Sequence, residues 1–251
     1  MTKKKIVKVD SEESKETKGT QTTQEPKETK KSPSDFQITP ESKKKAGQNR
    51  IISIILWVLA IAAECVAIWL MTKNPVNMVL LIGLVIVDLI LVVIGNMLWQ
   101  KANRLDPASE KDKVKFFVQN QLGAIISVIA FAPFVLVLLT NKNMDGKQKG
   151  IVGVVAVIAL GIAVWTGIDL NPPSVEQYAE QTQYVETLTG QNHVYWTKSG
   201  SKYHLYDDCY TINSNRTDEI YEGTVAQARE LKNIEELCKI CEDRWHKEHD
   251  E

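Results

Sequence analysis

Charged residues are nearly missing from the middle third of this 251-residue sequence, although both ends are rich in them. The mean hydropathy of −0.17 and the charged fraction of 24% hide this segregation. Long stretches without charge, set between solvated flanks, are the profile of a polytopic membrane protein rather than of one globular domain.

Large apolar side chains are scarce in the first 50 residues, which carry 13 basic against 8 acidic residues. The sizeable apolar side chains there are Ile6, Val7, Val9, Phe36 and Ile38. Such a segment buries too little surface to offset its ordering entropy. We therefore expect residues 1–50 to be a disordered cytosolic tail that helps to set topology, with an electrostatic tether to anionic lipid as the alternative.

Four apolar runs each approach the roughly 20 residues that a helix needs to cross a bilayer. The runs are 51–71, 76–99, 117–140 and 150–168. Because backbone groups in lipid must pair internally, we expect four transmembrane helices over residues 51–168. Pro133 should kink the third of them.

Lys and Arg near the ends of the runs predict the orientation. Nine lie on the side of the N-terminus and four on the opposite side, so we expect a multi-pass cell membrane protein with both termini in the cytoplasm. One observation points the other way, because no basic residue follows the fourth run until Lys198.

No Lys or Arg lies at the depth of Glu64 and Asp88, the two carboxyl groups inside the apolar runs. One interpretation is proton or cation handling, as in a small transporter or channel subunit. The other is a pair of neutral carboxyls, each hydrogen-bonded to neighbouring helices. The runs show no internal repeat and no pair of broken helices, which favours the structural role.

Small residues recur on one face of the fourth run. They are Gly153, Ala156, Ala159, Ala163 and Gly167. Their steps of three and four let another helix approach closely. That helix belongs either to this chain, which is the simpler reading, or to a second copy in a homo-oligomer.

Cysteine is also scarce, and three of the four cysteines lie in the last 43 residues. We expect a linker helix over residues 169–192 and a small module over 193–251. The stretches HVYWT and KYHL predict a hairpin that carries His204, with Cys209 just past its end. Thr224 and Gln227 form a capping-box pattern, and the helix that it opens leads to CKIC.

Zinc prefers four nitrogen or sulfur ligands in a tetrahedron. His204, Cys209, Cys238 and Cys241 would supply this set, with His246 as the reserve nitrogen ligand. A module this small, with few large aliphatic residues, usually needs a metal site or disulfide bonds for a stable fold. A redox pair at CKIC would normally lie in a larger βαβ context, which is absent here. On the outer face of a membrane these cysteines could instead oxidise.

The segments VYWTKSGSKYH, YEGTVAQA and CKIC together resemble the metal-binding domain of the Ada methyl-phosphotriester repair proteins. The upstream segments IILWVLAIAAECVAIWLM and KANRLDPASEKDKVKFFVQNQLG look like a group of uncharacterised multi-span membrane proteins of Gram-positive bacteria. The resemblance implies a zinc-binding fold. It departs from the Ada pattern of four cysteines, because His204 stands at the first ligand position.

Residues 171–251 hold 8 basic against 16 acidic residues, whereas a DNA-binding domain needs a basic surface. Binding to nucleic acid and alkyl-accepting thiolate chemistry on DNA are therefore not expected. We expect an α-helical membrane protein with a small C-terminal α+β zinc-binding module. Its role would be non-enzymatic, in interaction with a protein partner or in sensing, and the alternative is a proton or cation transporter that uses Glu64 and Asp88.

Overall fold

The structure is a computed structural model that describes residues 5–9, 38–215, 217–232, 234 and 236–249. The chain forms two compact units. One comprises residues 38–174, and the other combines the strand at residues 5–8 with the chain from Val175 onward.

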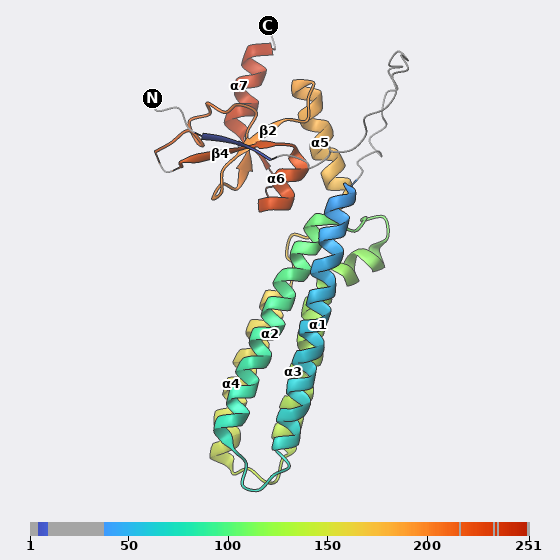
Figure 1. Cartoon of the computed structure of the whole chain (residues 1–251), viewed down its shortest axis with the longest axis vertical. Coiled ribbons are helices and arrows are strands. Elements are labelled where there is room, and N and C mark those ends of the chain that lie inside the picture. Colours follow the sequence, from blue (N-terminus) through green and yellow to red (C-terminus); the bar gives the residue numbers. More distant parts are fainter. Residues whose placement is uncertain (1–4, 10–37, 216, 233, 235, 250–251) are drawn as a thin grey trace, which may run out of the picture. The chain divides into compact units, whose positions relative to one another are not determined.

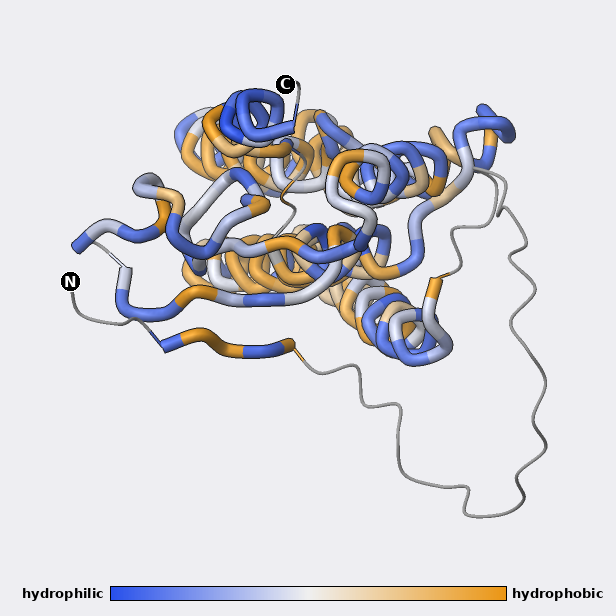
Figure 2. Tube along the Cα trace, turned by 90° about the horizontal axis from the view of Figure 1, so that it is seen from above, coloured by the Kyte–Doolittle hydropathy of each residue, from blue (hydrophilic) through white to orange (hydrophobic). Residues whose placement is uncertain are grey.

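Four long helices make up the first unit and run side by side (Figure 1). They are α1 (Pro40–Leu70), α2 (Met78–Leu105), α3 (Lys113–Thr140) and α4 (Gly146–Gly167). All four are long and apolar enough to cross a membrane. Seen from above, the tubes of these helices are mostly orange, the colour of hydrophobic residues (Figure 2). The four expected long apolar helices are therefore present, with ends that differ from the predicted boundaries by up to eleven residues.

Helix α1 begins eleven residues earlier than the predicted first span, inside the segment expected to be a disordered tail. The Thr39 side chain accepts a hydrogen bond from the Ser42 N–H, and Pro40 occupies the first helical position. An N-cap threonine followed by proline is a local helix-start signal, which explains the earlier start. The expectation of a disordered tail is thus wrong for residues 40–50, and its stretches 1–4 and 10–37 lie outside the described residues.

The small-residue face of α4 is buried against neighbouring helices of the same chain. A Cβ atom added to Gly167 would lie 2.5 Å from the Ala124 backbone nitrogen, closer than any real Cβ contact. Helices α3 and α4 therefore cross at a point where only glycine fits. This arrangement fits the simpler of the two readings, in which the face packs within the chain.

Asn96 connects α2 to the other three long helices through a fully buried side chain. Its Oδ1 accepts a hydrogen bond from Trp57 Nε1 at 3.2 Å, and its Nδ2 donates to Ser127 Oγ at 3.1 Å and to the Ala163 carbonyl at 3.0 Å. Because lipid offers no hydrogen-bonding alternative, such a satisfied amide fixes which helix faces meet.

The second unit contains α5 (Val175–Thr189), short strands and two further helices. Helix α5 lies inside the range 169–192 expected for a linker helix, but its Val185 belongs to the core of this unit. The remaining elements are β1 (Lys5–Lys8), β2 (Val194–Trp196), β3 (Lys202–Tyr203), β4 (Glu219–Gly223), α6 (Val225–Lys232), β5 (Glu236–Leu237) and α7 (Lys239–His249). One sheet has the order β1-β4-β2, and β3 pairs with β5 in a second, parallel pair. Val185, Trp196 and Tyr203 lie in its main apolar core.

Strand β1, at the start of the chain, pairs in parallel with β4 of the C-terminal module. Lys5 lies opposite Glu219 and forms a salt bridge with it at 3.0 Å. The Val9 N–H donates to the Glu222 carbonyl at 2.9 Å, and Gln227 Nε2 donates to the Val9 carbonyl at 3.0 Å. The expectation of a disordered tail is therefore also wrong for residues 5–8. The strand that pairs with them, β4, lies more than 200 residues later in the sequence.

Candidate metal centre

A two-way backbone bridge fixes the position of His204. Tyr195 and His204 exchange N–H to carbonyl hydrogen bonds of 2.8 and 2.7 Å. The predicted hairpin is present only as this bridge, because β2 otherwise pairs with β4, and β3 with β5. The bridge nevertheless holds the His204 backbone within the module.

Parallel pairing of β3 with β5 brings Cys238 next to His204. Tyr203 lies opposite Leu237, and the Cys238 N–H donates to the Tyr203 carbonyl at 2.9 Å. Helix α7 starts at the next residue, and the Cys241 N–H donates to the Cys238 carbonyl at 3.0 Å. Cys238 therefore directly precedes α7, and Cys241 lies in its first turn.

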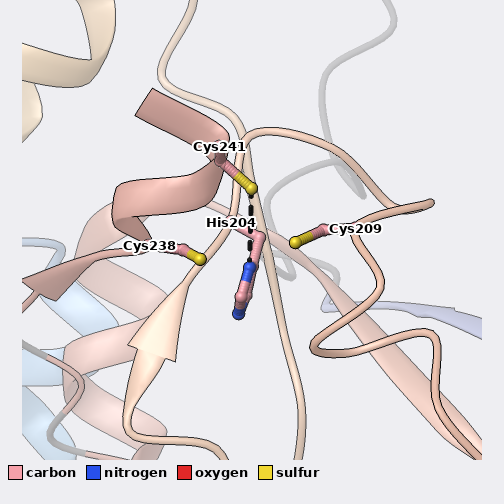
Figure 3. Close-up of side chains that lie close together, drawn as sticks. All are labelled: His204, Cys209, Cys238 and Cys241. Carbon is pink, nitrogen blue, oxygen red and sulfur yellow. Dashed lines mark hydrogen bonds between the residues drawn. The ribbon is translucent and has the colours of Figure 1, made fainter. Parts of the chain in front are cut away.

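The four residues predicted from spacing come together in one buried cluster (Figure 3). The four are His204, Cys209, Cys238 and Cys241, whose ligand atoms all lie within 4.8 Å of one another. The His204 Nδ1 and Cys241 Sγ atoms are 3.6 Å apart. A tetrahedral site with metal–sulfur bonds of about 2.3 Å separates neighbouring ligand atoms by roughly 3.6–3.8 Å. The cluster could therefore hold a metal ion with little rearrangement.

Thr211 lies against this cluster and was not identified from the sequence. Its hydroxyl is 3.2 Å from Cys209 Sγ, 3.5 Å from His204 Nδ1 and 4.0 Å from Cys238 Sγ. Hydrogen bonds to ligand atoms orient the ligands of a metal site. The only signal in the sequence is a hydroxyl residue two positions after Cys209, which is too common to be informative.

Burial and local hydrogen bonds set the protonation of the cluster. Burial, reinforced by the positive charge of Lys202, lowers the pKa of His204 to about 4, so the imidazole is neutral near pH 7 and can act as a ligand. Burial raises the pKa of the Cys241 thiol to about 12, opposed by the Leu205 and Tyr206 N–H groups. Burial also acts to raise the pKa of Cys209, but hydrogen bonds, first those from Thr211, outweigh it and lower that pKa.

The reserve ligand His246 is not part of the cluster. It lies exposed on α7, with its ring edge-on to Trp245 at a centroid distance of 5.3 Å. His193 is also elsewhere and contacts Glu222 at 3.3 Å. Among the histidines, only His204 therefore provides a nitrogen to the cluster in the described part of the module.

Glu64 and Asp88 are both buried in the helical unit, at 5% and 3% exposure. Glu64 Oε1 accepts a hydrogen bond from the Phe134 backbone N–H at 3.0 Å, beside the helix-interior Pro133. Asp88 Oδ1 has no hydrogen-bond partner among the described residues. The buried amide of Asn96, on the same helix as Asp88, hydrogen-bonds with Trp57, Ser127 and the Ala163 carbonyl.

No family model, no curated protein and no solved structure matches this chain. The geometry of the chain itself therefore carries the functional argument.

Proposed function

We propose that this chain is a multi-pass cell membrane protein whose small module is held in shape by a structural zinc ion and serves a non-enzymatic role in protein interaction or sensing. The observation that carries the proposal is the buried cluster of three cysteine sulfurs and one neutral imidazole.

The donor set is the basis for choosing zinc. Soft sulfur ligands combined with one imidazole suit zinc, and four protein ligands without an open position are typical of structural rather than catalytic sites. All four residues are at most 6% exposed. Bound zinc would contribute folding free energy directly to a module with a small core. The resemblance to the Ada metal-binding domain supports the same assignment, and the excess of acidic residues argues against a role on DNA.

Pairing of β1 with β4 supports the proposed topology. Both strands belong to one sheet, so the two ends of the chain would lie on the same face of the membrane, as an even number of spans requires. The excess of Lys and Arg on that side favours the cytoplasm, where free thiols stay reduced and available to a metal.

Metal analysis of the purified full-length protein tests the proposal. The full chain is needed because β1 contributes to the module. We expect about one zinc per chain in the native protein and in Cys65→Ser, whose cysteine lies exposed on α1, outside the cluster. Cys238→Ser and His204→Ala should lose most of the metal. Equal zinc content in all four proteins would exclude the cluster as the site.

A second candidate function is proton or cation transport, favoured by the unpartnered Asp88 Oδ1 inside the helical unit. The Glu64 contact to the Phe134 amide instead favours a structural carboxyl. Flux into liposomes separates the two functions. If the chain is a transporter, the native protein should show ion flux, and this flux should fall in Asp88→Asn. If the native protein shows no more flux than empty liposomes, both carboxyl groups have a structural role.

A further inference from the structure

Strand β1 lies along the edge of β4 that β2 leaves free (Figure 1). It buries little apolar surface there, because Ile6 is 43% exposed and the Lys5 side chain is 73% exposed. Val9, just after the strand, is partly buried and packs against the core of the module. A segment held mainly by backbone pairing and an exposed salt bridge lies at the low end of local stability within a fold.

Gln227 fastens the end of this segment. Its Oε1 accepts a hydrogen bond from the Thr224 N–H at 2.8 Å within the capping box of α6, and its Nε2 donates to the Val9 carbonyl at 3.0 Å. Gly223 leaves room for this arrangement, because a Cβ atom at that position would collide with the Gln227 side-chain oxygen. One amide therefore caps α6 and binds the N-terminal segment at the same time.

Side-chain contacts of β4 lead to the metal centre. Ile220 is 2% exposed and belongs to the same buried cluster as Cys209, Cys238 and Cys241. Ile6 is the register partner of Ile220, and register partners on neighbouring strands project to the same face of a sheet. Ile6 therefore flanks the residue through which β4 packs against three of the four candidate ligands.

Strand β2 provides a second connection between β4 and the metal centre. Tyr195 is the register partner of Glu222 in β4, and the Tyr195 backbone exchanges two hydrogen bonds with His204. The Val9 N–H donates to the carbonyl of the same Glu222 at 2.9 Å. The backbone of one β4 residue thus lies between the N-terminal segment and the strand that holds the fourth candidate ligand.

We propose that docking of β1 on β4 is linked to metal binding, so that the module releases its N-terminal segment when the metal is lost. This inference rests on the proposed zinc site and names how its occupancy reaches the rest of the chain. Metal–ligand bonds would fix the cluster against which Ile220 packs and the His204 backbone that Tyr195 binds. Because linkage is reciprocal, docked β1 raises the zinc affinity of the centre by the same factor by which zinc favours docking.

The variant Gln227→Glu tests the linkage, because it separates the two roles of Gln227. Glutamate serves equally well at this position of a capping box, but it has no N–H to donate to the Val9 carbonyl. We expect the full-length variant to bind zinc at least fivefold more weakly than the native protein, since coupling between two sites typically amounts to about 5–150-fold. Gln183→Glu, the same change at an exposed position of α5, should keep the native affinity. Competition with a chromophoric chelator at one fixed pH compares the three proteins.

Hydrogen exchange gives the reciprocal measurement on the native protein. Amide exchange of residues 5–9 is followed by mass spectrometry in zinc-loaded and in chelator-treated full-length protein. We expect the protection of this segment to fall at least fivefold when zinc is removed, and to be reduced already in zinc-loaded Gln227→Glu. The four long helices, which lie outside the metal cluster, should exchange alike in both states and serve as the internal control.

The outcomes separate this inference from the assignment of zinc. A native protein that binds no zinc would remove the assignment itself. If zinc binds but residues 5–9 are equally protected with and without it, the linkage is refuted without any variant being needed. Equal zinc affinity of the native protein and of a Gln227→Glu protein whose residues 5–9 have lost protection would also refute the linkage alone.

Discussion

The carboxylate of Glu64 on α1 accepts a hydrogen bond from the backbone N–H of Phe134 on α3 at 3.0 Å. Phe134 follows Pro133, which removes one hydrogen bond from the interior of α3. A side chain from α1 thus accepts a hydrogen bond from a main-chain donor next to the proline inside α3.

Replacing Glu64 should show whether this hydrogen bond stabilises the helical unit. Glu64→Leu leaves the Phe134 N–H without its acceptor and should lower the free energy of unfolding by about 1–3 kcal/mol. Glu64→Gln retains an acceptor oxygen and should cost clearly less. Thermal unfolding in detergent measures both, with Cys65→Ala at the exposed neighbouring position as control. Equal losses for Leu and Gln would mean that the hydrogen bond is not what stabilises this site.

The close crossing of α3 and α4 predicts a contrast between two glycines of the same helix. Gly167→Ala would place a methyl group 2.5 Å from backbone atoms of Gly123 and Ala124, and overpacking of this kind costs about 1–3 kcal/mol. Gly161 has no atom within 4 Å of an added Cβ, so Gly161→Ala should be neutral or slightly stabilising. Unfolding monitored by helical circular dichroism compares them, and equal stability of the two variants would contradict the crossing.

The parallel register of β1 on β4 can be tested by cross-linking. Lys5 and Glu219 are register partners, and neighbouring strands lie about 4.8 Å apart, within the Cα separation that a disulfide tolerates. Lys5→Cys with Glu219→Cys should therefore cross-link under mild oxidation of the zinc-loaded protein. Lys8→Cys with Glu219→Cys is offset by three residues, about 10 Å, and should cross-link much less. Similar yields for the two pairs would disprove the register.

Metal affinity should depend on pH with a definite sign. The Cys241 pKa of about 12 means that the metal-free thiol holds its proton at neutral pH, so metal binding releases it. The affinity for the metal should consequently rise by about tenfold per pH unit for each proton released. Competition with a chromophoric chelator between pH 6 and pH 8 measures this on the full-length protein. An affinity that stays flat over this range would be inconsistent with thiolate ligation.

Much of the architecture follows from local signals in the sequence. The four apolar runs predict the four long helices because their length and lack of charge leave few alternatives. The reciprocal hydrogen bonds of Thr224 and Gln227, at 2.8 and 3.2 Å, confirm the predicted capping box. The set of His204 and three cysteines was predictable because ligand chemistry requires four donors and the module offers few others.

The remaining features depend on pairings between distant segments. Residues 5–9 show only a weak alternation of polar and apolar side chains, and lysines precede them. The local sequence therefore does not predict that this segment pairs with β4. The parallel pairing of β3 with β5, two residues each, is likewise too short to leave a pattern. Thr211 matters only because the turn after Cys209 brings its hydroxyl back to the sulfurs.

The pairing of β1 with β4 imposes an order on biosynthesis. Strand β1 leaves the ribosome before β4, which follows more than 200 residues later. At about 5–20 residues per second, that interval is roughly 10–40 s. All four long helices are translated within this interval, so the sheet can be completed only after them, and a nascent chain that stalls before β4 cannot assemble it.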